Sequence, residues 1–153
     1  DADGEAALVQ AAVADGAVAA MTAALGPRAM ARYDVLPTGG FTDPDYGQVG
    51  LTEQQARAAV PGCLVVTVPY GANERAIIDS RTTGLLKLIS DPRRETVLGA
   101  HAVGEDALEV IQAIATAMAA GIDIVTLARI PFAYPTYTSI IATAAMQLLA
   151  GPG

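Results

Sequence analysis

Two runs of strand-type residues on either side of a polar turn constrain the fold of this chain most. Residues 85–89 and 97–103 are rich in β-branched and leucine side chains, and the turn residues 91–95 (DPRRE) join them. This pattern predicts a β-hairpin. In the first run Leu86 and Leu88 share a face while Lys87 points the other way, because side chains alternate along a strand. The hairpin therefore has an apolar face that other elements must cover.

Alanine-rich segments supply the helices that can cover it. Residues 5–25 favour a helix because alanine is the strongest helix former, and Gly26 with the proline after it ends the segment. Residues 106–120 favour a second helix that stops at Gly121. The other expected elements are strands at 35–41, 46–49 and 64–68, short helices at 52–59 and 124–128, and a last helix at 136–149. Thr52 followed by Gln55 resembles a capping box at the start of the 52–59 helix. Strands followed by helices indicate an α+β fold, an antiparallel sheet with helices packed on one face.

Length, charge and cysteine content exclude several classes of protein. A chain of 153 residues fits one domain with a short appendage. Its formal charge of −7 with scattered basic residues argues against nucleic-acid binding. We find no apolar run long enough to span a bilayer and no signal-peptide pattern, so we expect a cytoplasmic protein. Cys63 is alone, which rules out an intrachain disulfide, and no ligand spacing suggests a metal site.

Three stretches resemble one domain of a known enzyme family. They are residues 41–53 (FTDPDYGQVGLTE), residues 84–104 (GLLKLISDPRRETVLGAHAVG) and residues 133–136 (AYPT). In order and spacing they are similar to the C-terminal dimerisation domain of the FAD-dependent pyridine nucleotide-disulfide oxidoreductases, the family of glutathione reductase, lipoamide dehydrogenase, mercuric reductase and soluble transhydrogenase. The resemblance divides the chain into a remnant of the FAD domain with its last helix (1–27), a linker (28–35) and the dimerisation domain (36–153).

The resemblance implies partners and cofactors for the complete enzyme. It implies a homodimer that uses FAD and NAD(P), with Asp1, Leu8 and Val9 near the flavin and with Tyr134 and Pro135 reaching the partner's flavin. The acidic residues at the start of the chain are equally well explained as favouring a helix N-terminus. Because no G-x-G-x-x-G motif is present, we expect this chain alone to bind neither cofactor and to be inactive in redox chemistry.

The candidate catalytic residues lie in the third stretch. Where the disulfide reductases of this family have a histidine–glutamate dyad, this chain has Tyr134 and Ser139. A phenol with an ordinary pKa of about 10 is a poor base near pH 7 but can donate a hydrogen bond or a proton. This puts thiol–disulfide chemistry in doubt, although transhydrogenases and mercuric reductases of the family also have a tyrosine near this place. Tyr134 can equally be an interface residue. The resemblance also implies a cis peptide bond before Pro135.

Other interpretations stay open at this point. The chain can be half of a split enzyme, working with a separate FAD- and NAD(P)-binding chain. It can also be a repurposed domain that performs non-redox acid/base chemistry, or binds a small molecule, in a pocket near Tyr134. His101, the only histidine, and Tyr137 would then be further proton donors, although a lone histidine is more often structural. Ser139 and its neighbours can simply cap the last helix.

Overall fold

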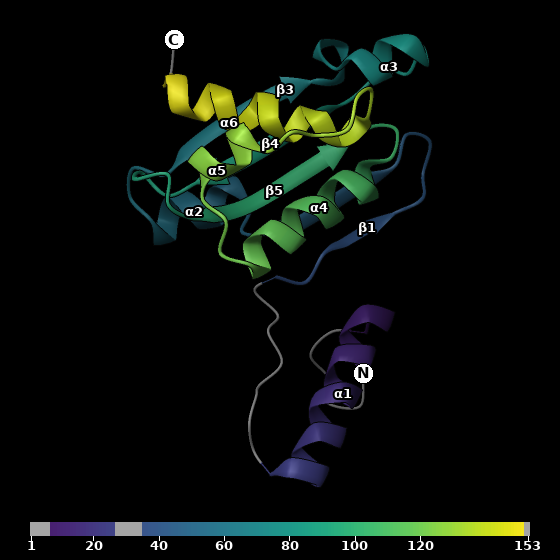
Figure 1. Ribbon diagram of the computed structural model, residues 1–153, viewed down its shortest axis with the longest axis vertical. Helices are drawn as coiled ribbons and strands as arrows, with labels where there is room; N and C mark the ends of the chain where they lie inside the picture. Colours follow the sequence, from purple (N-terminus) through teal and green to yellow (C-terminus); the bar gives the residue numbers. More distant parts are fainter. Residues whose placement is uncertain (1–6, 27–34, 152–153) are drawn as a thin grey trace. The chain divides into compact units, whose positions relative to one another are not determined.

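The computed structural model describes residues 7–26 and 35–151, which belong to two compact units (Figure 1). The first unit ends at Leu36 and the second begins at Pro37. Within the first, α1 (Val9–Leu25) follows the expected alanine-rich segment, and Gly26 ends it with a φ of 77°. The expected flavin ligand Asp1 and most of the expected linker lie outside the described residues.

The second unit is built on a five-stranded antiparallel sheet with the order β1-β2-β5-β4-β3. The strands are β1 (Thr38–Gly40), β2 (Tyr46–Gly50), β3 (Leu64–Pro69), β4 (Leu85–Ser90) and β5 (Val97–Val103). The predicted hairpin is confirmed as β4 and β5, in which Leu86 lies opposite Ala102 and Leu88 opposite Ala100. All four of these side chains are buried.

One face of the sheet carries the main helical layer, as the α+β prediction required. Figure 1 shows α4 (Ala107–Ala119), α5 (Ile124–Arg129) and α6 (Ile140–Ala150) in front of the strands. On α4, Val110, Ile111 and Ile114 recur at helical spacing, and all three are fully buried. The helical layer thus covers the apolar face that the hairpin pattern predicted.

The opposite face carries the short helix α2 (Glu53–Ala59). Lys87, which alternates with the buried leucines of β4, donates from Nζ to Glu53 Oε2 at 2.7 Å. The predicted capping box is confirmed, because Thr52 Oγ1 accepts from the Gln55 amide while Gln55 Oε1 accepts from the Thr52 amide. Ala56 of this helix is packed with Cys63 and Ile89, so Cys63 is a buried apolar residue.

Two features were not predicted. Between β3 and β4 the chain forms the 3-10 helix η1 (Tyr70–Ala72) and the short helix α3 (Glu74–Ile78). The last predicted helix is divided into the 3-10 helix η2 (Tyr137–Ser139) and α6. The peptide bond between Tyr134 and Pro135 is cis, as the resemblance implied, and a second cis bond precedes Pro44. In the described part of the chain, no helix combines the length and hydropathy needed to cross a membrane.

Candidate functional site

The segment that joins α5 to α6 carries the expected site residues. Tyr134 is 77% exposed and stands before the cis peptide bond. The hydroxyl of Thr136 donates to the carbonyl of Ala133 at 2.7 Å, which closes the loop around Tyr134 and Pro135. We call residues 133–139 the Tyr134 loop. It therefore presents a large aromatic ring to solvent from a turn that this hydrogen bond closes.

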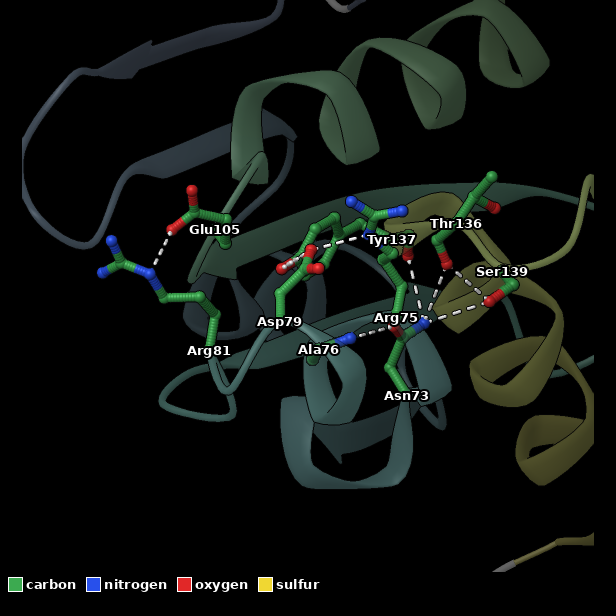
Figure 2. Close-up of polar contacts among 9 residues, drawn as sticks. All are labelled: Asn73, Arg75, Ala76, Asp79, Arg81, Glu105, Thr136, Tyr137 and Ser139. Atoms are coloured by element: carbon green, nitrogen blue, oxygen red, sulfur yellow. Dashed lines mark hydrogen bonds and ion pairs between the residues drawn. The ribbon is translucent and has the colours of Figure 1, made fainter.

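Asn73 fastens this loop to α3. Its amide nitrogen Nδ2 donates to Ser139 Oγ at 3.0 Å and to the carbonyls of Thr136 and Tyr137 at 3.2 and 3.4 Å (Figure 2). Its Oδ1 accepts from the Ala76 amide at 3.1 Å, so Asn73 is also the N-cap of α3. Asn73 is only 2% exposed, and its side-chain hydrogen bonds join these two elements.

A second connection runs from the other end of α3. The hydroxyl of Tyr137 donates to Asp79 Oδ2 at 3.0 Å, and Arg75 Nε donates to the same oxygen at 2.6 Å. Figure 2 shows the side chains of Arg75 and Tyr137 converging on Asp79. Tyr137 is itself buried, with its ring centroid 5.9 Å from that of Tyr70. The loop and α3 thus meet at two points.

These contacts set the protonation states of the pair. The hydrogen bond from Arg75 lowers the pKa of Asp79 below its ordinary value, and the bond from Tyr137 adds to the effect. Burial, followed by the hydrogen bond to Asp79, raises the pKa of Tyr137 to about 12. Near neutral pH, Asp79 is therefore ionised and Tyr137 is protonated. Tyr137 therefore acts here as a hydrogen-bond donor to Asp79.

A cavity of about 280 Å³ opens beside the loop. It is lined by Arg75, Asp106, Glu109, Pro135, Thr136, Tyr137 and Thr138. Of the donors that the repurposed-domain alternative names for a pocket near Tyr134, Tyr137 lines this cavity, whereas Tyr134 and His101 do not. The lining contains one cationic and two carboxylate side chains.

The three expected catalytic residues are not all brought together. Tyr134 and Ser139 share the Tyr134 loop, and Ser139 Oγ also donates to the Thr136 carbonyl at 2.8 Å. His101 lies on β5 opposite Lys87, and its Nε2 is 3.1 Å from the carbonyl oxygen of Leu51, just ahead of α2. Because Lys87 contacts α2, His101 shares the sheet face opposite the main helical layer. The structure gives His101 a structural contact.

The expected flavin contacts of the first unit are described in part. Leu8 is the N-cap residue of α1, with extended backbone, and Val9 opens the helix with a 79% exposed side chain. The positive end of a helix dipole suits a partly negative group. Among the described residues, no three His, Cys, Asp or Glu side chains are grouped to hold a metal ion.

Sequence reasoning missed Asn73, Arg75 and Asp79. One signal was present: an asparagine directly before an acidic first turn is a typical N-cap pattern. A helix of five residues has too few turns to show apolar periodicity, however, so α3 gave no pattern of its own. The contacts from Asn73 span 63 to 66 positions, and no local pattern encodes them.

Comparisons with known proteins point to one enzyme family. Residues 36–145 match the family model described as the pyridine nucleotide-disulphide oxidoreductase dimerisation domain. The chain is 33% identical over 145 residues to dihydrolipoyl dehydrogenase 2 of Haloarcula marismortui, which covers 95% of this chain and 30% of that protein. It is 37% identical over 110 residues to the mercuric reductase of Bacillus cereus, covering 72% of this chain and 17% of that protein.

Solved structures agree with these relatives. The Cu(II) complex of the HOCl-induced flavoprotein disulfide reductase RclA from Escherichia coli superposes with a TM-score of 0.85 at 28% identity. That match covers 94% of this chain and 33% of the reductase. The chain thus spans about a third or less of the proteins it matches. The repurposed-domain alternative gains no support from these relatives, all of which are oxidoreductases by name.

Proposed function

This chain belongs to the dimerisation-domain family of the pyridine nucleotide-disulphide oxidoreductases, and from that premise we propose that it closes a flavin site across a two-fold dimer. Two copies pair, and the Tyr134 loop of each reaches the flavin held by the other. The complete enzyme then uses FAD and NAD(P)H, through domains on the same polypeptide or on a separate chain. The dimerisation module by itself is not redox-active.

The observation that carries this proposal is the exposed ring of Tyr134 on an anchored loop. Tyr134 is 77% exposed, so its ring lacks the packing contacts that a buried tyrosine makes. The loop that carries it is nevertheless anchored by the hydrogen bonds of Thr136 and Asn73. A rigid aromatic that projects from a surface is typical of a residue that contacts another molecule. Its hydroxyl can donate one hydrogen bond to an acceptor on that molecule.

Further apolar side chains lie exposed on the element bound to the loop. Ile77 and Ile78 of α3 are 55% and 61% exposed. Isoleucine is among the residue types most often buried, so two adjacent exposed ones mark a surface that a partner covers. Met146 and Leu149 of α6 add a second exposed pair. We propose that α3 and α6 contribute to the contact between the two copies.

The residues present fit a flavin contact but not a complete flavin site. Tyr134 and Pro135 would contact the isoalloxazine ring of the partner, and Leu8 and Val9 would lie at a helix N-terminus that suits its partly negative edge. The flavin, when bound, supplies the chemistry that accepts a hydride from NAD(P)H and passes electrons onward. Since the chain has no glycine-rich dinucleotide motif, the binding of the phosphates must come from outside it.

A pair of variants at Tyr134 tests the proposal in the flavin-loaded oxidoreductase that contains this chain. Tyr134→Phe keeps the ring and removes the hydroxyl, whereas Tyr134→Ala removes both. We expect Tyr134→Ala to change the flavin absorbance spectrum and to slow electron transfer to the acceptor. Tyr134→Phe then shows how much of each effect comes from the hydroxyl group alone. Unchanged spectra and turnover in both variants would contradict the proposal. Mass analysis of the native material shows whether the flavin domains lie on a second chain.

A further inference from the structure

We propose that Asn73 is a positioning residue for flavin chemistry, because it clamps the Tyr134 loop to α3 and so fixes where Tyr134 stands. This inference rests on the proposed function of Tyr134. Asn73 touches neither the ring of Tyr134 nor, in our account, the flavin. It acts through the backbone that follows Pro135.

The clamp is built from one side chain that serves two elements. Asn73 Nδ2 has the carbonyls of Thr136 and Tyr137 and the hydroxyl of Ser139 within 3.0 to 3.4 Å. An amide with two N–H groups suits such a cluster of oxygens, because each of them can accept. The Oδ1 of the same side chain caps α3 through the Ala76 amide. The Asn73 residue itself is 2% exposed, so water has little access to its amide group.

The second contact makes α3 a rigid base for the clamp. Asp79, just after the end of α3, accepts from Tyr137 at 3.0 Å and from Arg75 of α3 at 2.6 Å. The loop is therefore bound near both ends of α3. Two contacts keep it from pivoting about either one. Displacement of a reacting contact by about 1 Å can reduce a rate by roughly a hundredfold, so this fixing has a chemical consequence.

Asn73→Asp isolates the contact with the loop from the cap of the helix. Aspartate caps a helix as well as asparagine does, so Oδ1 keeps the Ala76 amide. The second oxygen, however, replaces the donor and faces the carbonyl oxygens of Thr136 and Tyr137, where it repels them. Thr52→Ala is the matched control, because it removes the side-chain cap of α2 on the opposite face of the sheet and leaves the loop untouched.

The first readout is independent of the flavin. Hydrogen exchange followed by mass spectrometry reports the opening of residues 133–139 in the same protein. We expect Asn73→Asp to raise their exchange rates roughly tenfold and Thr52→Ala to leave them unchanged. Unchanged exchange in Asn73→Asp, or an equal rise in Thr52→Ala, would overturn the clamp.

The second readout links the clamp to Tyr134. In the flavin-loaded oxidoreductase we expect Asn73→Asp to lower kcat roughly tenfold, with little change in the KM for NAD(P)H, and Thr52→Ala to leave kcat unchanged. Combined with Tyr134→Ala, the Asn73→Asp substitution should add no further loss, because it acts through that ring. Losses that multiply in the double variant would overturn the inference. A loss in Tyr134→Ala with none in Asn73→Asp overturns the clamp and leaves the proposed function standing. No loss in Tyr134→Ala overturns both.

Discussion

Tyr137 donates its phenolic hydrogen to Asp79 at 3.0 Å, across 58 positions of the sequence. The bond joins the start of the last helical segment to the residue that follows α3, and Arg75 holds the same carboxylate oxygen. It fixes the base of a loop whose tip, Tyr134, is exposed. The arrangement separates two tyrosines by role: Tyr137 is a buried structural donor, and Tyr134 is free to contact another molecule.

Removing the buried hydroxyl should weaken the domain measurably. We expect Tyr137→Phe to lower the free energy of unfolding by about 1 kcal/mol, because one hydrogen bond to a carboxylate is lost while the ring packing stays. Chemical denaturation in urea measures this difference. Tyr134→Phe is the control, because its exposed hydroxyl should contribute nothing to stability. Equal losses of unfolding free energy in the two variants would show that the hydrogen bond from Tyr137 to Asp79 adds no stability of its own.

The Asp79 contact should make stability depend on acid pH. Its pKa is lowered in the folded protein, chiefly by Arg75, so this contribution is complete above the ordinary value of 3.8 and is lost as pH falls through the lower folded pKa. We expect Asp79→Asn to be less stable than the parent at pH 7 and to approach it as the pH falls below about 4. Unfolding curves at several pH values check this. A difference that does not change with pH would contradict the assignment.

A charge on the exposed face of α3 should disrupt the dimer. Ile78→Asp is expected to raise the dimer dissociation constant by tenfold or more, since burying an unpaired carboxylate at an interface is costly. Analytical ultracentrifugation over a concentration series measures the constant. Gln54→Glu, an exposed position on α2, adds a charge elsewhere and should leave the constant unchanged. A dimer equally stable in both variants would remove α3 from the interface.

The turn before α4 should tolerate only glycine. Gly104 has a φ of 147°, and a Cβ there would overlap the ring of Tyr70. We expect Gly104→Ala to fold but to be less stable by about 2–4 kcal/mol, from strain and overpacking. Gly71→Ala is the control, because a Cβ at that position meets nothing within 4 Å. Thermal unfolding of both variants decides the point, and comparable midpoints would show that the turn can relax.

Local patterns predicted much of this fold. The alternation of Leu86, Lys87 and Leu88 predicted both the hairpin and its buried face, and Thr52 with Gln55 predicted a capping box that the structure contains. Each of these signals lies within a few residues of the element it specifies. The family resemblance is also confirmed, and with it the cis bond before Pro135.

The site was less accessible to sequence reasoning. Tyr134 and Ser139 were found by position within a family motif, and their expected catalytic roles stay predictions. Asn73 and Asp79 escaped because their partners lie 58 to 66 positions away, and long-range side-chain contacts leave no local periodicity. For His101 the residue type suggested a proton donor, whereas in the structure its ring contacts the carbonyl of Leu51.

Sedimentation equilibrium of this chain at tens of micromolar tests the central claim most directly, because every role proposed for Tyr134 needs a second copy. We predict a mass of twice the 15.6 kDa of a single chain. A mass of 15.6 kDa that persists across the concentration range would contradict pairing through this domain, and with it the closure of a partner's flavin site by Tyr134.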